Sequence, residues 1–224
     1  MTNSIPNDTK PQNPFTFNIS LSVLNHLGRH LYRSFVTVLG EAVSNAWDAD
    51  AKNVWIFLDR ANHSLIIKDD GDGMSKNDFQ HKFLKIGYSK RKNGQRKSHG
   101  GRPYIGRKGI GKLALLSCAD RITVISKREN AGYIGGSIDN AGLDLAIKDD
   151  LAANEYALEG WNEDLFKPHM QGHNEGTIIH FANIKGGIRN TVGYLRKIAA
   201  LYFRFSLLAQ LRHFDTNDPY KSMT

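Results

Sequence analysis

The first chemical signal in this sequence is a set of three polar residues, Glu41, Asn45 and Asp48, in the segment 34–50. If this segment is helical, their spacing places all three on one face. A carboxylate and a carboxamide one turn apart can divide two tasks: the carboxylate polarises a water molecule, and the amide oxygen coordinates a hard cation such as Mg²⁺. An ordinary solvated polar stripe has the same spacing, so other motifs must decide between the two interpretations.

A turn rich in aspartate and glycine, Asp69–Met74, follows an apolar run. Gly71 and Gly73, with one residue between them, allow the backbone to lie against a planar ring, and an aspartate at a strand end can accept a hydrogen bond from an exocyclic amine. The turn also resembles a calcium loop. That loop requires a bidentate Glu at its twelfth position, where this chain has Gln80. A plain β-turn stays as the alternative interpretation.

A glycine-rich sequence at 106–112 precedes a segment with helical character. Backbone amides at the start of a helix point toward an anion. The spacing Gly-x4-Gly-Lys is close to a P-loop, but Leu113 stands where a Ser or Thr should hold Mg²⁺. It also imitates a dinucleotide-binding fingerprint, yet a polar loop precedes it instead of a strand. The motif therefore predicts phosphate binding without predicting either of those folds.

Basic residues are concentrated in one stretch of the chain. Residues 79–119 hold eleven Lys or Arg and no Asp or Glu, whereas the rest of the chain carries 19 basic and 22 acidic residues. The formal net charge of +8 thus comes from one segment on a mildly acidic body. This indicates a localised site for a polyanion, either nucleotide phosphates or nucleic acid, although a solvated basic loop explains the charge equally well.

Composition excludes several classes of protein. With 224 residues, 40% hydrophobic and 23% charged, the chain suits one globular α/β domain with a sizeable core. No apolar run approaches the roughly 18–20 residues of a membrane helix, and residues 1–14 lack the pattern of a secretory signal. Cys118 is alone, so it can form neither an internal disulfide nor a cysteine metal cage, and we expect it to fill the core. We expect a cytoplasmic or nucleoid-associated protein that does not bind membranes.

The elements that must position these motifs follow from apolar periodicity. In chain order it predicts a strand at 15–20, helices at 20–32 and 34–50, strands at 54–58 and 64–68, a helix at 75–86, an unpatterned loop at 87–109, a helix at 111–118, strands at 122–126, 132–138, 143–147 and 177–181, and a helix at 191–211. This order favours an α/β (α+β) two-layer sandwich, with one mixed, mostly antiparallel sheet and helices on a single face. It argues against a doubly wound parallel sheet, because strands and helices do not alternate strictly.

Four motifs occur in the order and spacing of the GHKL ATPases: Glu41-x3-Asn45-Ala-x-Asp48-Ala49, Asp69-x-Gly71-x-Gly73-Met74, Gly106-x2-Gly109-x-Gly111 and Gly176-Thr177. The sequence resembles this superfamily, which contains gyrase B subunits, MutL proteins, heat-shock chaperones, MORC proteins and sensor histidine kinases, over about residues 15–185. The resemblance implies a Bergerat fold that holds ATP between helices, sheet and a mobile lid.

The resemblance also implies roles for individual residues. Glu41 resembles the general base that orients the attacking water, Asn45 the Mg²⁺ ligand, and Asp48 a residue lining the pocket beneath the nucleotide. Asp69 is similar to the aspartate that binds the adenine amine, with Thr177 assisting. The remaining nucleotide-binding positions implied in this way are Gly71, Gly73, Met74, Ser89, Lys90, Gly106, Lys108, Gly109, Ile110, Gly111 and Lys112.

Within the superfamily, the sequence is most similar to nucleic-acid-associated members. Histidine kinases generally lack the general-base glutamate that Glu41 matches, and they need a dimerisation helix pair with a phospho-accepting His. The chaperones usually carry Arg where this chain has Gly40, and their lids are far less basic. The resemblance therefore implies a MORC-like or MutL-like ATPase module in which Mg²⁺-ATP closes the lid and a homodimer.

Composition and the family resemblance together give the expected domain limits. Residues 1–14, which hold three prolines, are expected to be a disordered tail, and residues 15–187 the ATP-binding domain, with its lid at about 87–112. Residues 188–224 would lead to a missing transducer or middle domain. Related ATPases take a γ-phosphate-contacting Lys or Arg from that domain, so we expect hydrolysis by this chain alone to be weak.

Two other functions stay open on the sequence. The segment 82–108 could bind nucleic-acid phosphates, with nucleotide regulatory or absent. A histidine-kinase catalytic domain is the third hypothesis, and it requires phosphate transfer to a partner.

Overall fold

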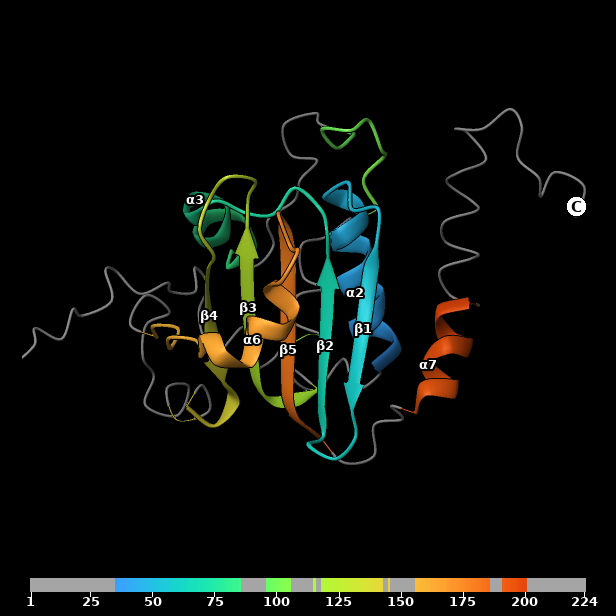
Figure 1. The fold of residues 1–224 in the computed structure, drawn as a ribbon, viewed down its shortest axis with the longest axis vertical. Helices are drawn as coiled ribbons and strands as arrows, with labels where there is room; N and C mark the ends of the chain where they lie inside the picture. Colours follow the sequence, from blue (N-terminus) through green and yellow to red (C-terminus); the bar gives the residue numbers. More distant parts are fainter. Residues whose placement is uncertain are drawn as a thin grey trace, which may run out of the picture.

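A five-stranded sheet forms the centre of the computed structural model of this chain. The structure describes residues 35–85, 96–105, 115, 118–142, 145, 156–185 and 191–200. The strands are β1 (Val54–Asp59), β2 (Ser64–Asp69), β3 (Ala119–Lys127), β4 (Ile134–Asp139) and β5 (Gly176–Ile184), in the order β1-β2-β5-β3-β4 (Figure 1). All pairings among these strands are antiparallel. The expected α/β fold is therefore confirmed, and the described sheet is antiparallel instead of mixed.

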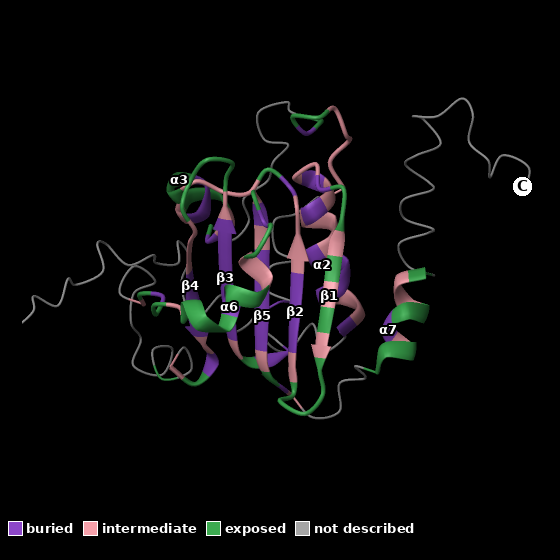
Figure 2. Cartoon of the chain, in the orientation of Figure 1, coloured by how far each residue is buried: buried purple, intermediate pink, exposed green. Residues whose placement is uncertain are grey.

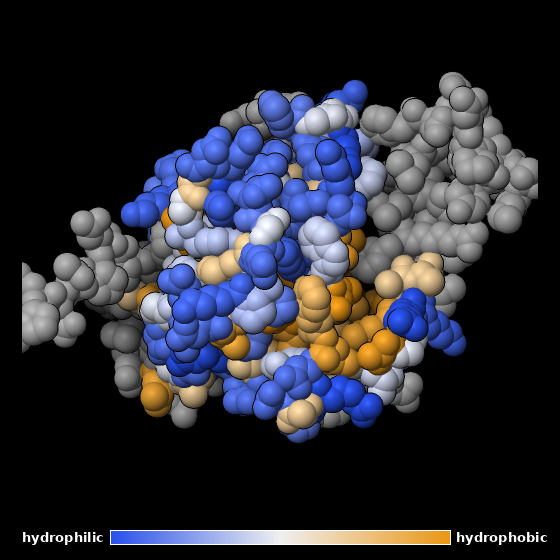
Figure 3. Space-filling model, in the orientation of Figure 1, coloured by the Kyte–Doolittle hydropathy of each residue, from blue (hydrophilic) through white to orange (hydrophobic). Residues whose placement is uncertain are grey.

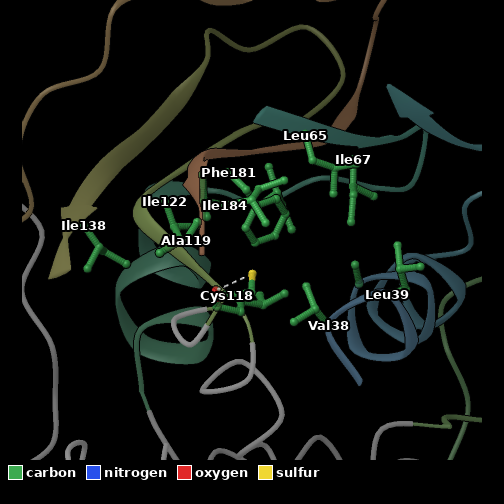
Figure 4. Close-up of a cluster of buried hydrophobic side chains, with 14 of the residues drawn as sticks. Val38, Leu39, Leu65, Ile67, Cys118, Ala119, Ile122, Ile138, Phe181 and Ile184 are labelled. Atoms are coloured by element: carbon green, nitrogen blue, oxygen red, sulfur yellow. Dashed lines mark hydrogen bonds between the residues drawn. The ribbon is translucent and has the colours of Figure 1, made fainter. Parts of the chain in front are cut away.

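One face of the sheet packs against α2 (Phe35–Asp48). Phe35, Val38 and Leu39 recur at helical spacing, are buried, and belong to one core cluster with Leu65 and Ile67 of β2. Figure 4 shows Val38 and Leu39 of α2 facing these strand residues. Burying each such side chain stabilises the fold by about 1.5–3 kcal/mol relative to leaving it exposed. Burial of this stripe fixes the rotation of α2 on the sheet, and with it the direction of the polar positions between the apolar ones.

The opposite face carries α6 (Glu163–Met170), which lies in front of the sheet in Figure 1. Phe166 of α6 is fully buried against Ile66, Ile125 and Ile178. The expectation that helices cover a single face is therefore wrong. Sequence periodicity missed α6 because Phe166 is its one buried residue and Pro168 lies inside it, so no apolar stripe marks this helix.

The outer edge strand β1 is only partly covered on the α6 side. Its residues alternate between half-buried and exposed (Figure 2), and Trp55 and Phe57 keep 39% and 43% of their surface exposed. The Lys68 ammonium lies 5.3 Å from the Trp55 ring centroid, and the His169 ring lies 4.6 Å from that of Phe57. Figure 3 shows apolar surface on this face, whereas its upper part is hydrophilic.

The end of α2 has a left-handed residue that redirects the chain. Asp50 has φ 60°, the Asp50 N–H donates to the Trp47 carbonyl, and the Ala51 N–H donates to that of Ala46. This is a Schellman arrangement, which usually has glycine at the left-handed position. An aspartate there costs roughly 1 kcal/mol of backbone strain, so its side chain is expected to have a compensating role.

Most predicted elements are confirmed to within a few residues: the helix at 34–50 and the strands at 54–58, 64–68, 122–126, 132–138 and 177–181. The helix predicted at 75–86 is capped by Ser75 as expected. It consists of the short α3 (Lys76–Asp78) and a π-helical turn, Phe79–Phe83. The helix at 191–211 is seen as α7 (Val192–Ile198). The strand predicted at 143–147 is wrong at Leu145, which is helical, and the elements predicted at 15–32 lie outside the described residues.

Two expectations from composition can be compared with the fold. Cys118 is a free, buried thiol within the main core, and burial raises its pKa to about 12. It therefore acts as the apolar filler that was expected. Among the described residues, no helix is long and apolar enough to cross a membrane.

Candidate functional site

The ends of several elements meet at the upper edge of the sheet in Figure 1. β2 ends there at Asp69, β3 ends at Lys127, β5 begins at Gly176, and α2 ends at Asp48. Residues about 20 to 130 positions apart in sequence are thus adjacent in space. Three of the four motifs singled out in the sequence, those around Glu41, Asp69 and Gly176, lie on or beside these ends, which makes this edge the candidate site.

The polar stripe of α2 is not an ordinary solvated surface. Glu41 and Asn45 are half-buried, and Asp48 is 6% exposed. Oδ1 of Asp48 accepts a hydrogen bond from the N–H of Ile105 at 2.8 Å. The stripe therefore connects the body of the domain to the residue that directly precedes the glycine-rich sequence at 106–112.

Asp69 is a carboxylate held in place from two sides. Its Oδ1 accepts hydrogen bonds from the N–H of Gly71 at 2.9 Å and from the N–H of Thr177 at 3.3 Å. Burial raises the pKa of Asp69 to about 6, although both backbone donors lower it. Within the described residues these donors both bind Oδ1, so Oδ2 retains its acceptor capacity for a ligand.

A buried serine that the sequence analysis did not single out joins the three strands of the site. Oγ of Ser126 on β3 accepts from the Met74 N–H at 3.0 Å, donates to the Gly176 carbonyl at 2.9 Å, and lies 3.0 Å from Oγ1 of Thr177. Its polar character at the end of a buried apolar strand was the available signal. Ser126 fixes the Asp69–Met74 turn relative to β5.

The glycines of this turn are required by close backbone packing. A Cβ on Gly71 would lie 2.7 Å from the carbonyl oxygen of Ala49, and one on Gly73, which has φ +64°, would overlap the carbonyl of Lys127. The Asp72 N–H also donates to the Ala49 carbonyl at 2.8 Å. The turn is therefore held between the end of α2 and the end of β3.

The second aspartate of the turn has a purely structural set of partners. Oδ1 of Asp70 accepts from the N–H groups of Lys52 and Asn53, at 2.8 and 2.7 Å, and Oδ2 accepts from the Asn53 side chain at 2.9 Å. Asp70 thus ties the start of β1 to the end of β2, and its oxygens are already engaged. Both oxygens of Asp70 thus accept hydrogen bonds, whereas both donors described for Asp69 bind its Oδ1.

A hairpin at 96–105 docks on the end of α2, inside the segment for which the sequence predicted an unpatterned loop. Lys97 and Pro103 form its bridge. The hairpin donates two hydrogen bonds to the Asp50 carboxylate: Oδ1 accepts from Oγ of Ser98 and Oδ2 from the N–H of Gly100, both at 2.6 Å. These bonds explain why an aspartate occupies the left-handed position after α2.

Arg102 and Trp47 hold the other side of this hairpin. The Arg102 guanidinium lies 4.8 Å from the Trp47 ring centroid and donates to the Ala51 carbonyl at 2.6 Å. The indole N–H of Trp47 donates to the Pro103 carbonyl at 3.0 Å. The hairpin is thereby anchored on α2 at positions close to Asp48.

Replacing Gly100 with Ala should release the hairpin from α2. A Cβ on Gly100 would lie 2.8 Å from Cγ of Asp50, so the carboxylate must move and lose its bonds. We expect the free energy of unfolding to fall by about 1–2 kcal/mol and the amides of Ser98 and Ile105 to exchange hydrogen faster.

The matched control is Gly132→Ala, because a Cβ on Gly132 would meet no atom within 4 Å. Urea denaturation and amide hydrogen exchange measure both variants. Equal exchange at the Ser98 and Ile105 amides in the Gly100 and Gly132 variants would contradict the anchoring role of Asp50.

The structure brings part of the predicted site together. Glu41, Asn45 and Asp48 share α2, while Asp69, Gly71, Gly73, Met74 and Thr177 lie on the adjoining turn and on β5. The other predicted positions lie outside the described residues: Ser89, Lys90, Gly106, Lys108, Gly109, Ile110, Gly111 and Lys112.

Comparisons with known proteins give two findings. Residues 32–135 match the family described as histidine kinase-, DNA gyrase B- and HSP90-like ATPase. A protein of Herpetosiphon aurantiacus with the name "Putative type II restriction enzyme HgiDII" is 36% identical over 194 residues, which are 84% of this chain and 29% of that protein. The chain therefore spans less than a third of the length of this relative.

Proposed function

We propose that residues 32–135, which match the histidine kinase-, DNA gyrase B- and HSP90-like ATPase family, form a GHKL-type ATPase domain, and that the chain binds Mg²⁺-ATP at the upper edge of its sheet and hydrolyses it slowly. Asp69 is the observation that carries the proposal. It is a half-buried carboxylate fixed by two backbone donors on Oδ1, and Oδ2 can accept a hydrogen bond from the exocyclic amine of adenine.

In this proposal α2 supplies the groups for hydrolysis. Glu41 orients the attacking water and accepts its proton, as a general base does. Asn45, one turn further along, provides an oxygen ligand for Mg²⁺, which usually takes few protein ligands beside the phosphates of its substrate. When bound, Mg²⁺ neutralises charge on the phosphates. Both side chains are half-buried on one helix, so their separation is fixed by the helix.

The hairpin supports a role for the following glycines in phosphate binding. Because the Ile105 N–H is bonded to Asp48, the chain enters the glycine-rich sequence at 106–112 from a point fixed on α2. We extend the proposal to lid closure over about 87–112 and to nucleotide-dependent homodimerisation of a domain that covers 15–187. Residues 188–224 would then lead to the next domain.

Binding of a non-hydrolysable ATP analogue, measured by calorimetry with and without Mg²⁺, tests this function directly. We expect Mg²⁺-dependent binding at micromolar to millimolar concentration. ATP analogue should also protect the segment 87–112 from proteolysis. An absence of binding by the chain would overturn the ATPase assignment, and binding without any change in proteolysis would overturn the lid.

The raised pKa of Asp69 predicts how nucleotide affinity depends on pH. The ionised carboxylate accepts from the adenine amine, whereas a protonated one places a donor on Oδ2. With a pKa of about 6, Asp69 is about nine-tenths protonated at pH 5, so we expect affinity about tenfold lower there than at pH 7.5. Calorimetry across this range measures it. Tripolyphosphate, which has no base, is the control, and an equal loss with it would contradict Asp69 as the cause.

Nucleic acid binding is a second candidate function, favoured by the exposed basic residues Arg96, Lys97 and His99 on the anchored hairpin. The name of the relative places that protein among restriction enzymes, a class that acts on DNA. We therefore extend the proposal to an ATPase module of a larger, MORC-like or MutL-like protein that acts on nucleic acid. DNA binding should weaken steeply with salt, and Arg96→Gln with Lys97→Gln should reduce the salt slope by about two. An unchanged slope would overturn this candidate.

A further inference from the structure

A buried histidine contacts the back of the candidate adenine site. His173 lies in the turn after α6 and is 4% exposed. Its Nε2 is 2.7 Å from the main-chain carbonyl oxygen of Asp69, and its Nδ1 is 2.8 Å from the hydroxyl of Tyr133. None of the motifs found in the sequence includes His173 or Tyr133.

The two partners fix which ring nitrogen of His173 carries the proton. A carbonyl oxygen only accepts, so Nε2 carries the hydrogen and donates to Asp69, and Nδ1 accepts from the Tyr133 hydroxyl. Burial lowers the pKa of His173, and the ammonium groups of Lys68 and Lys127 lower it further, whereas the bond to Asp69 and the charge of Asp70 raise it. The ring is therefore neutral at neutral pH, with a defined tautomer.

Tyr133 is itself held in place. Its ring stacks on His173 with centroids 5.9 Å apart, the ammonium of Lys127 lies 5.5 Å from its centroid, and Trp161 packs edge-on at 6.4 Å. The pair of Tyr133 and His173 thus forms a rigid brace between the β3–β4 connection and the end of β2.

On its β5 side Asp69 lies beyond the strand pairing, although it still pairs with Val54 of β1 on the other side. The register of β2 with β5 ends at Lys68 opposite Ile178. A Cβ on Gly176, which has φ +125°, would overlap the Asp69 carbonyl, so β5 approaches this residue closely. The Asp69 carbonyl oxygen is hydrogen-bonded to His173. The side chain of Asp69 belongs to the α2 side of the sheet, with Ser126 and Thr177, while the brace packs with the cluster around Phe166 on the other side.

We propose that His173, supported by Tyr133, is a positioning residue that sets the preference of this site for adenine over guanine. It holds the main chain of Asp69, and so the direction of the Asp69 carboxylate, without contacting nucleotide. Adenine presents an amine donor to that carboxylate, whereas guanine presents a carbonyl acceptor. Displacing Asp69 by a fraction of an ångström therefore weakens ATP binding and leaves phosphate contacts intact. This inference rests on the proposed binding of ATP.

The experiment compares the Kd values of non-hydrolysable ATP and GTP analogues by calorimetry. In His173→Ala we expect the preference for ATP over GTP to fall about tenfold, with the GTP affinity unchanged. Tyr133→Phe, which removes only the hydroxyl, should lose part of the preference. His173→Gln restores a donor near the position of Nε2 and should recover most of it.

His180→Gln is the matched control, because His180 is equally buried on β5 but packs against Phe166. It should leave the ATP preference unchanged. Equal loss of both affinities in His173→Ala, with no change in preference, would overturn the proposal and leave the ATPase function standing. If the unmodified chain binds neither analogue, both fall together.

A nitrogen-15 NMR measurement tests the brace without nucleotide. The unmodified chain should show the neutral His173 ring with hydrogen on Nε2. Hydrogen on Nδ1, or a charged ring at pH 7.5, would overturn the arrangement on which the proposal rests.

Discussion

Asp69→Asn should weaken binding of the ATP analogue at least about a hundredfold while leaving the domain folded and more stable at pH 7.5. The Asn carbonyl can still accept from Gly71 and Thr177, as Oδ1 does. Its amide then places two N–H donors where Oδ2 stands, and these face the donor amine of adenine. A buried donor left without an acceptor costs about 1–3 kcal/mol in addition to the lost bond.

The gain in stability follows from the raised pKa of Asp69. Its folded-state pKa of about 6 exceeds the ordinary value of 3.8, so the ionised carboxylate destabilises the fold above pH 6. This penalty fades as pH falls from 6 to 3.8 and amounts to about 3 kcal/mol when complete. Because Asn is neutral, we expect the variant to gain about 1–3 kcal/mol of unfolding free energy at pH 7.5 and progressively less toward pH 4.

Asp70→Asn is the matched control for this experiment. Asp70 accepts three hydrogen bonds from Lys52 and Asn53, so its loss should lower the unfolding free energy by about 1 kcal/mol. ATP affinity should change by less than about threefold. Denaturation measures the stability of both variants, and calorimetry measures their ATP affinity. Asp69→Asn should gain stability and lose affinity, whereas Asp70→Asn should lose stability and keep affinity. If Asp69→Asn kept its ATP affinity, or lost stability as Asp70→Asn does, the assignment of Asp69 to the adenine site would be contradicted.

Glu41→Gln should lower kcat for ATP by about a hundredfold or more and leave the Kd of the ATP analogue within about threefold. Gln keeps the size and hydrogen-bonding geometry of Glu41 on α2 but cannot accept the proton of the attacking water. General-base catalysis contributes about 10²–10⁴-fold in rate. A loss confined to kcat distinguishes this role from uniform binding.

Single-turnover hydrolysis of radiolabelled ATP measures the effect even where steady-state turnover is slow. Glu163→Gln, on the exposed start of α6, controls for the loss of one negative charge. Unchanged hydrolysis in Glu41→Gln would exclude Glu41 as the base. Transfer of the label to protein instead of release as phosphate would favour the kinase hypothesis.

Local periodicity made much of this fold predictable. The apolar stripe of α2 and the runs that became β1, β2, β3 and β5 bury their side chains in the main core, so the sequence pattern and the packing agree. The motifs around Glu41 and Asp69 were also visible, because α2 and the glycine turn set their spacing within a few residues. Where an element depends on its own residues, the sequence therefore predicts it.

The hairpin at 96–105 and α6 were not predictable in this way. The hairpin donates hydrogen bonds to Asp50 and Ala51 and accepts one from Trp47, residues that lie about fifty positions earlier. Its own sequence has no apolar period. α6 contributes one buried side chain, Phe166. Their positions depend on partners that only the folded sheet brings near.

The sequence by itself determined α2, the face of α2 that carries Glu41, Asn45 and Asp48, most of the strands, and the resemblance of the domain to the GHKL ATPases. Only the tertiary structure decided that Ser126 and the Tyr133–His173 brace hold the Asp69 turn, and that the described donors to Asp69 both bind Oδ1 while both oxygens of Asp70 accept hydrogen bonds. The physical reason is the separation along the chain between the residues that interact. Helical and strand periodicity are set by neighbours in the chain, whereas hydrogen bonds and burial at a site are set by residues brought together from four separate elements.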